Sequence, residues 1–420
     1  MTATCLRSVT GQRHTVRGGV TGLVRTLGEV LLVNETSCAI RSVATSVLRT
    51  ALLGATTAGM GLIAGATWGL PTALGASRRA VEAVTSVSPR WRDGAFHNTQ
   101  PPTAGEPVSA PAMIYAMLTR GDRGRPAGEV PLTVPEHPTV ADQLAVTWYG
   151  HASVLIEVDG RRVLVDPVWS ERVSPSRLVG PKRMHPVPAE IEDLPPLDVV
   201  IISHDHYDHL DLRTVRRLLA HSGAPFVVPL GVGAHLRAWG VPADRVVELD
   251  WGGQARVREL TLTCTEARHF SGRGLTRDNT LWASWVITGP QHGVFFGGDT
   301  GYTPVFAEIG ARYGPFNLTL LPIGAYGDAW PDIHMTPEEA VRAHGDLGGG
   351  LLVPIHWGTF NLGFHEWDEP VRRLLAAAGR DTENGARVAV PIPGERFTVL
   401  DPPPLHQRWW SGLTPAQARG

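Results

Sequence analysis

Cysteine is scarce in this sequence, and no two cysteines stand close together. Three cysteines, Cys5, Cys38 and Cys264, are spread over 420 residues. This spacing excludes a disulfide framework and a zinc–thiolate motif, because both need paired thiols. Any metal site in this chain must therefore be built from imidazoles and carboxylates.

An excess of charge of either sign is missing too. The 38 Lys and Arg nearly balance the 40 Asp and Glu, which leaves a formal net charge of −2. Such a balance gives no electrostatic basis for nucleic acid as a partner, and none is expected. Histidine is plentiful by contrast, with 17 residues against 6 Tyr and 10 Phe, so the histidines are the residues to follow along the chain.

Charge is absent altogether from residues 50–77, a Gly- and Ala-rich stretch between Arg49 and Arg78. The stretch is long enough to cross a bilayer. Three interpretations stay open: a membrane anchor, an export signal that starts late, and a soluble Gly/Ala-rich extension. A true start at Met60 would remove its first ten residues, 50–59. The protein is accordingly expected to be cytoplasmic or membrane-associated.

Composition divides the chain into four regions. An N-terminal extension, an arm that packs on the main domain, the main domain itself and a C-terminal tail are expected at residues 1–80, 81–140, 141–400 and 401–420. Within the arm, Phe96-His97-Asn98 stands out, and the apolar run 112–118 predicts a short helix.

Short β-like runs alternate with helical patterns from about residue 145 onward. The Asp159-Gly160 turn between two such runs predicts a β-hairpin. Strands are expected at 145–149, 153–158, 162–165, 197–202, 226–228, 260–263, 294–296 and 351–353. Helices are expected at about 212–221, 231–239, 303–312, 336–346 and 369–378. A layered α/β domain with two mixed sheets fits this order best.

The most informative stretch is His204-Asp205-His206-Tyr207-Asp208-His209, which follows the buried-type strand at 197–202. So much polarity at the end of a buried strand is unfavourable unless something compensates it. A divalent cation does so, because it binds carboxylates and neutral imidazoles. Four potential ligands within six residues exceed what one tetrahedral ion takes from one loop, so two neighbouring ions are expected. These four are His204, His206, Asp208 and His209.

A site for two ions needs further ligands from other loops. His269, Asp299 and His356 each follow a predicted strand, where loops converge at the end of a sheet. Glycines 297 and 298 precede Asp299 and let the backbone approach a ligand closely. Each of the three alone is as well explained by an ordinary buried or surface polar group. Together with the motif they make a set of seven candidate ligands.

The motif and the order of the later ligands resemble the metallo-β-lactamase superfamily, and most closely its N-acyl phosphatidylethanolamine-hydrolysing phospholipase D branch. The similarity covers about residues 140–365, and Tyr207 within the motif is typical of the branch. Other resembling segments are 148–155, 166–168, 174–176, 180–183, 298–302, 322–326 and 356–360. The resemblance implies an αββα sandwich of two mixed β-sheets flanked by helices, with a binuclear metal site at one edge.

The resemblance also implies a role for each ligand. His204, His206 and His269 would hold the first ion. Asp208, His209 and His356 would hold the second, and Asp299 would bridge the pair. Zinc is the usual metal of such sites, although the ligand types also suit iron or manganese. Residues His151 and Asp166 are expected behind the ligands, where a carboxylate that accepts a ring N–H fixes the tautomer of a ligand imidazole.

The implied reaction is attack on phosphorus by a hydroxide formed between the two ions. Asp208 or Asp299 would orient the attacking water. His334 takes the place of a substrate-contacting histidine, and Tyr326 and Trp330 are expected to line the pocket. A phospholipid, N-acyl phosphatidylethanolamine or a related diester, is then the expected partner, with membrane association possible.

Two alternatives remain open. The first is a lactone or sugar-phosphate lactone hydrolase that uses the same metal pair. The second is a non-catalytic, membrane-associated metal-binding protein.

Overall fold

The computed structural model of the protein describes residues 69–103, 119, 121–274, 276–379, 386–404 and 408–413. The helix predicted at 112–118 and most of the uncharged stretch lie outside these ranges. Among the described residues, no helix combines the length and apolarity needed to cross a membrane.

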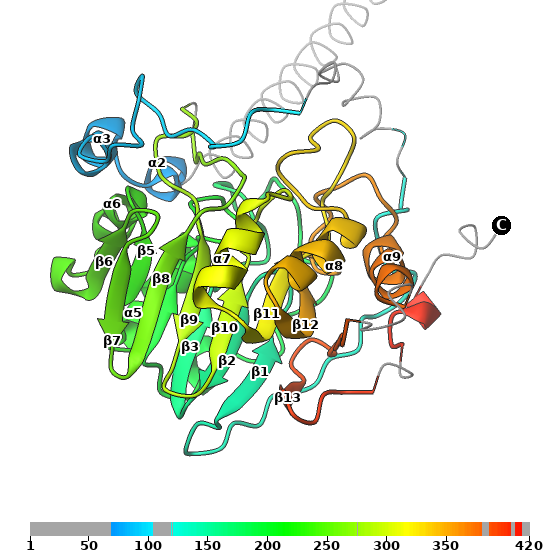
Figure 1. Ribbon diagram of the computed structural model, residues 1–420. Coiled ribbons are helices and arrows are strands. Elements are labelled where there is room, and N and C mark those ends of the chain that lie inside the picture. The colour runs from blue at the N-terminus through cyan, green and yellow to red at the C-terminus, as the bar shows by residue number, and fades with distance from the viewer. Residues whose placement is uncertain are drawn as a thin grey trace, which may run out of the picture. The chain divides into compact units, whose positions relative to one another are not determined.

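Two mixed β-sheets form the centre of the domain. One contains β1 (Leu144–Trp148), β2 (Val154–Val158), β3 (Arg161–Val165), β4 (Val199–Ile201), β5 (Phe226–Pro229), β6 (Val246–Leu249) and β13 (Arg396–Thr398). The other contains β7 (Gln254–Val257), β8 (Leu260–Thr265), β9 (Ser284–Thr288), β10 (Gly293–Phe296), β11 (Phe316–Pro322) and β12 (Gly349–Ile355). Their strand orders are β13-β1-β2-β3-β4-β5-β6 and β12-β11-β10-β9-β8-β7 (Figure 1).

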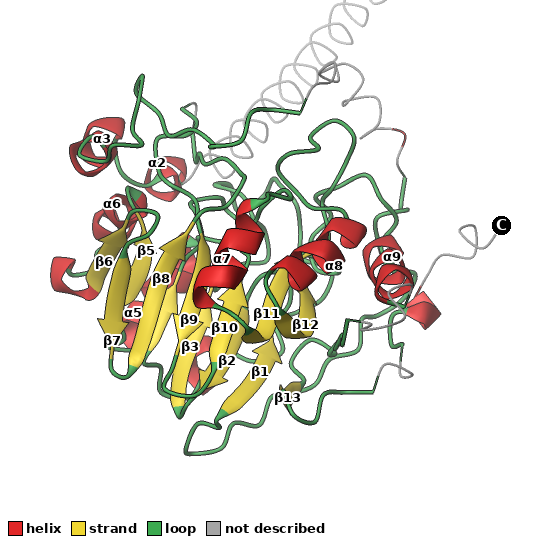
Figure 2. Ribbon diagram, in the orientation of Figure 1, coloured by secondary structure: helices red, strands yellow, loops and turns green. Residues whose placement is uncertain are grey.

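Helices cover the outer faces of both sheets, as the colours of Figure 2 make clear. The helices of the described residues are α2 (Leu70–Leu74), α3 (Arg78–Thr85), α5 (Leu212–His221), α6 (Val232–Ala238), α7 (Val305–Tyr313), α8 (Pro337–Asp346) and α9 (Glu369–Ala378), with short 3-10 turns at Ile191–Asp193, Ala243–Arg245 and Ser411–Leu413. Of these, α2 and α3 lie above the strand ends in Figure 1. In Figure 1, α7 and α8 lie in front of the six-stranded sheet and α5 lies behind the seven-stranded one. The predicted αββα sandwich is therefore confirmed.

The alternation of side chains along the strands explains why the seven-stranded sheet is buried on both faces. Val163 and Val165 of β3 belong to the core between the sheets, whereas Leu164 packs toward the outer helices. Val199 and Val200 of β4 likewise point to opposite faces of the sheet, Val199 into the core between the sheets and Val200 toward the outer helices. Val215 of α5 packs with the side chains on this outer face. Because successive side chains of a strand point to opposite faces, a continuous apolar run is needed for burial on both sides.

The predicted hairpin at Asp159-Gly160 is present between β2 and β3, which pair antiparallel. Both turn residues have positive φ, 48° and 78°, as a tight type I′ turn requires. Residue pairs are in register from Val154 opposite Val165 onward. The turn thus fixes which face of each strand enters the core.

Strand direction determines where the predicted site residues meet. In the first sheet β1, β3 and β4 run the same way, because β2 is antiparallel to β1 and β3 while β4 pairs parallel with β3. In the second sheet β8, β10, β11 and β12 share one direction. The loops that carry the candidate ligands follow strands of these two sets. Their carboxyl ends therefore gather at one edge of the sandwich.

Candidate metal centre

His204, His206 and His269 form one group of converging ligand atoms. His206 Nδ1 lies 2.8 Å from His204 Nε2 and 3.3 Å from His269 Nε2. Bonds of about 2.0–2.1 Å from nitrogen to zinc place neighbouring ligands roughly this far apart. His204 and His269 are buried, and His206 is half-buried. The three nitrogen atoms are thus arranged as ligands of a single ion would be.

Asp208, His209 and His356 form a second such group. Asp208 Oδ2 lies 3.5 Å from His209 Nε2 and 3.3 Å from His356 Nε2. His209 and His356 are buried, while the Asp208 side chain keeps 14% of its surface exposed. A second ion held here would remain accessible to solvent on the side of Asp208.

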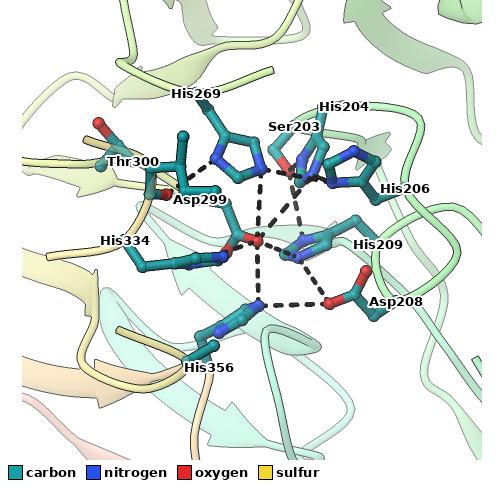
Figure 3. Close-up of polar contacts among 12 residues, drawn as sticks. Ser203, His204, His206, Asp208, His209, His269, Asp299, Thr300, His334 and His356 are labelled. Carbon is teal, nitrogen blue, oxygen red and sulfur yellow. Dashed lines mark hydrogen bonds and ion pairs between the residues drawn. The ribbon is translucent and has the colours of Figure 1, made fainter. Parts of the chain in front are cut away.

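Asp299 lies between the two groups, with the imidazoles directed toward its carboxylate (Figure 3). Its Oδ2 is 3.1 Å from His209 Nε2 and 3.0 Å from His356 Nε2. The same oxygen is 3.8 Å from His269 Nε2 and 4.0 Å from His204 Nε2. One oxygen atom therefore contacts ligands of both groups, which is the position that a bridging ligand needs.

Glycine 298 is what allows Asp299 to come so close. Its φ is +58°, and a Cβ there would stand 2.7 Å from Ser203 Cβ and 3.1 Å from the Ala283 carbonyl oxygen. A side chain would force these strands apart. The glycines noted in the sequence therefore serve the close packing of two strand ends.

The chemistry of these donors fits divalent metal ions. Within the described part of the chain, His209 Nε2 and Asp299 Oδ1 are buried without a hydrogen-bond partner. Buried polar atoms without partners are rare in folded proteins, and those that occur call for an unseen ligand or a functional reason. Five imidazoles and two carboxylates, as the two groups and Asp299 provide, are donors that zinc, iron and manganese all accept.

The protonation states of the cluster also suit metal binding. Burial lowers the pKa of His204 and of His269 well below the usual value, which keeps these imidazoles neutral. Burial would raise the pKa of the Asp299 carboxyl, but His209 and His356 together hold it well below its usual range. Burial likewise acts to lower the pKa of His356, but Asp299 and Asp208 raise it to about 9. A cation held between these groups would take the place of that proton.

Outer partners orient the ligand imidazoles. The Nδ1 of His209 lies 2.7 Å from Asp166 Oδ2, which also accepts from Ser203 Oγ at 2.6 Å. His269 Nδ1–H donates to the Ile333 carbonyl over 2.8 Å. Each contact leaves Nε2 free to face the metal side. His151 Nε2 lies 2.9 Å from Asp208 Oδ2, so both residues predicted behind the ligands stand beside one of them.

The backbone at the strand ends is held in a sparsely populated conformation. His151, Asp166, Ala325 and His356 have φ values of 55°, 42°, 60° and 60°. Non-glycine residues adopt positive φ uncommonly, and such strain collects at functional sites. The hydrogen bond from His356 N to the His151 carbonyl, 2.9 Å long, joins two of these residues. Contacts of this kind keep the strained loops in place.

A cavity of about 350 Å³ opens over the cluster. Four candidate ligands and His334 are among its lining residues. The His334 ring stacks on His356 at 5.1 Å, and its Nδ1 is 4.0 Å from Asp299 Oδ2. The remaining walls are largely apolar. They include Phe270, Trp330, Ile333, Leu362 and Phe364.

Tyr326 is not among the residues that line this cavity, contrary to the expectation from the sequence. Its hydroxyl donates to Glu369 Oε1 over 2.6 Å, and its ring stacks on His365 at 4.8 Å. The positive φ of Ala325 turns the chain at this point. The neighbouring Trp330 does line the cavity, with its ring N–H donating to the Ala325 carbonyl.

Sequence reasoning gave no role to two residues that shape the centre. Asn98 brackets the backbone of His269: its Nδ2 donates to the His269 carbonyl over 2.8 Å, and its Oδ1 accepts from the His269 N–H over 3.1 Å. Arg273 lies 4.1 Å above the Tyr207 ring and donates to the carbonyls of Asp205 and Leu210. Asn98 stood out in the arm, but a partner 171 residues away leaves no local signal.

Several known proteins are similar to this chain in sequence or in structure. The Beta-lactamase superfamily domain matches residues 161–357. An uncharacterized protein of Mycobacterium tuberculosis is 54% identical over 365 residues, which cover 84% of this chain and 97% of that protein. The N-acyl-phosphatidylethanolamine-hydrolyzing phospholipase D 1 of Caenorhabditis elegans is 39% identical over 290 residues, 64% of this chain and 81% of that one. Among solved structures, Igni18, a metallo hydrolase of Ignicoccus hospitalis, matches with a TM-score of 0.47 and 25% identity, covering 61% of this chain and 97% of its own.

Proposed function

Because the chain belongs to the metallo-β-lactamase superfamily and is a metal-dependent hydrolase, we propose that it is a phosphodiesterase of the phospholipase D type. Its substrate is N-acyl phosphatidylethanolamine or a related phospholipid. The cavity over the cluster carries the proposal, because its floor is polar and its walls are apolar. A diester with hydrocarbon chains needs both. The named activity of the Caenorhabditis elegans relative supports the same substrate class.

The proposed centre holds two divalent metal ions, of which zinc is the first choice and iron or manganese the alternatives. The residues of the first group would hold one ion and those of the second group the other, with Asp299 between them. When bound, the ions supply Lewis acidity that lowers the pKa of a water and offsets negative charge on the phosphate oxygens.

The chain's own side chains position the reactants. Asp208 lines the cavity, and its carboxylate can accept a proton from the water that attacks phosphorus. Asp299 Oδ1, which has no hydrogen-bond partner in the described part of the chain, offers a second acceptor. The His334 imidazole faces the same cavity and would donate a hydrogen bond to a phosphate oxygen or to the leaving group.

The apolar walls serve two purposes in this proposal. Phe270, Trp330 and Phe364 offer aromatic surface to an acyl chain, and the Trp330 and Phe364 rings already pack at 5.4 Å. They also exclude water from the side of the cavity away from the metal ligands. The same walls would accept an acyl lactone, which keeps lactone hydrolysis as the second candidate function.

Turnover by the purified, metal-loaded, full-length protein tests the proposal. We expect hydrolysis of N-acyl phosphatidylethanolamine and slower hydrolysis of a generic phosphodiester. Acyl lactones serve as the competing substrates, and the Asp299→Asn variant serves as the control for contaminating hydrolases. Turnover of lactones without turnover of either phosphodiester would contradict the proposal in favour of the second candidate.

A further inference from the structure

A second cavity, of about 250 Å³, contains none of the candidate metal ligands, although Tyr207 of the motif contributes to its wall. Its other walls come from Gly69 to Ala73, from the loop at 170–177 and from the start of α5. Arginines dominate the charged side chains of this cavity. They are Arg172, Arg177, Arg213, Arg216 and Arg273.

The two carboxylates of the same cavity, Glu171 and Asp211, have hydrogen-bonded or ion-paired partners of their own, although Asp211 also stabilises the charge of Arg213 and Arg273. Glu171 pairs with Lys182 at 2.7 Å, and Asp211 accepts from Ser170 Oγ at 2.7 Å and from the first turn of α5. Arg177, Arg213 and Arg216 form no salt bridge with any residue that the structure describes. The exposed guanidinium groups of Arg177 and Arg216 thus lie beside this cavity without a carboxylate partner in the described part of the chain, whereas the charge of Arg213 is partly offset by Asp211.

The position of the arginines is unfavourable for the protein alone. Arg213 lies in the first turn of α5 and Arg216 in the next, and the first turn carries no acidic residue. The positive end of a helix dipole disfavours cations there, although the Asp211 carboxylate at the N-cap offsets part of this effect. Burial lowers the pKa of Arg213 and the repulsion from Arg177 lowers it further, against the opposing effect of the Asp211 carboxylate. A bound anion would relieve both effects.

Two aliphatic side chains beside this cavity are exposed to solvent. Leu178 and Val179 are 52% and 62% exposed, and they directly follow Arg177. The base of their loop is closed by hydrogen bonds from Arg172 to the Gly180 carbonyl and from Val173 N to the Pro181 carbonyl, 2.7 and 3.1 Å long. The tip therefore projects from a fixed base. Exposed aliphatic residues among cations are typical of segments that lie at a membrane interface.

We propose that this surface docks the protein on an anionic phospholipid bilayer. A headgroup phosphate enters the cavity, where the forked donors of Arg177 and Arg213 match phosphate oxygens. Leu178 and Val179 enter the interfacial region of the bilayer. The inference rests on the proposed function, since a phospholipase meets its substrate at such a surface, but it concerns binding and not the chemical step.

Vesicle sedimentation with the full-length protein tests this docking surface. The vesicles contain phosphatidylcholine alone or phosphatidylcholine with phosphatidylglycerol, and no N-acyl phosphatidylethanolamine. We expect stronger binding to the anionic vesicles, which added salt weakens. Arg177→Ala, Arg213→Ala and Arg216→Ala should each weaken that binding about fivefold, as one basic residue near an anionic surface contributes. Leu178→Asp should weaken it as well.

Arg256→Ala on the edge strand β7 is the matched control, because Arg256 is exposed and lies outside the cavity. Its binding to anionic vesicles should equal that of the unmodified protein. If the three cavity variants bound anionic vesicles as strongly as the unmodified protein, the proposal would be overturned. Saturable binding of inorganic phosphate in the cavity without any vesicle binding would overturn it too, in favour of a soluble anion.

Detergent-dispersed N-acyl phosphatidylethanolamine separates this inference from the proposed function. Turnover of the dispersed lipid should survive in the three arginine variants, because none of them touches the metal cluster. Vesicle binding without any turnover by the unmodified protein would contradict the proposed function and leave the docking surface standing. Turnover by the unmodified protein, together with unchanged vesicle binding in the variants, would support the proposed function and contradict the docking surface.

Discussion

Asp299 is the residue on which both halves of the metal centre depend. Its Oδ2 lies within 4.0 Å of imidazole nitrogens from each group of ligands. It is 3% exposed, so its negative charge is compensated by the cluster and not by water. Removal of that charge leaves the surrounding imidazoles without their common partner.

Asp299→Asn should abolish hydrolysis and lower the metal content of the purified protein. The amide carries no charge, and one of its two ends is a donor that a metal ion repels. Elemental analysis and the phosphodiester assay measure the two effects. The exposed Asp244→Asn is the matched control, and a fully active Asp299→Asn variant with unchanged metal content would contradict the bridging role.

Asn98→Ala should weaken metal binding about tenfold, as the loss of a group that orients a ligand does. The variant loses the two hydrogen bonds that the Asn98 side chain makes with the N–H and the carbonyl of His269. Asn98→Asp keeps the acceptor but loses the donor, so an intermediate affinity is expected. Competition with a chelator measures these affinities, and the exposed neighbour His97→Ala is the control. Affinity unchanged in both Asn98 variants would exclude the positioning role.

At the residue scale, the sequence predicts the side chains that follow buried strands and fails where a side chain acts from far away. His269, Asp299 and His356 were predicted as ligands because each follows a β-like run, and the structure brings them together with the motif. Asn98 was not assigned because its contact depends on the tertiary fold. Tyr326 was expected to line the cavity, but its hydroxyl donates to Glu369 and its ring stacks on His365, contacts with residues about 40 positions away that sequence spacing does not reveal.

At the scale of elements, the strongly patterned segments were predicted well. The helices at 212–221 and 369–378 agree with α5 and α9, and the Asp159-Gly160 hairpin is confirmed. The predicted strands did not include β6, β7, β9, β11 and β13. Strand β7 alternates exposed and half-buried residues at a sheet edge, and β13 has three residues. Their formation depends on pairing with neighbours and not on a local apolar run.

Helix α8 carries a buried histidine whose protonation should couple stability to pH. Burial lowers the pKa of His344 to about 4, and its Nδ1 lies 2.7 Å from Thr319 Oγ1 of β11. The unfolded chain binds this proton below its usual pKa of about 6.5, whereas the folded protein does not. The free energy of unfolding should therefore fall as the pH drops from about 6.5 toward 4, by at most about 3 kcal/mol for this group.

Denaturant unfolding at several pH values measures this effect in the protein and in His344→Asn. The asparagine keeps an acceptor near Thr319 but does not titrate. The difference in unfolding free energy between the two proteins should shrink or reverse as the pH falls through that window. A difference that stays constant with pH would contradict the assignment.

At the scale of the whole molecule, average properties hide the features that matter most. The formal net charge is −2, yet one cavity collects five arginines. Composition cannot reveal this separation, because the arginines come from the loop at 170–177, from α5 and from Arg273. The division of the chain at residues 80, 140 and 400 stays a prediction.

Anomalous scattering from crystals of the metal-loaded protein tests the central claim most directly. The account predicts two peaks, one among His204, His206 and His269 and one among Asp208, His209 and His356. Asp299 should contact both. A single peak, or peaks away from these side chains, would contradict the binuclear centre from which the proposed chemistry is derived.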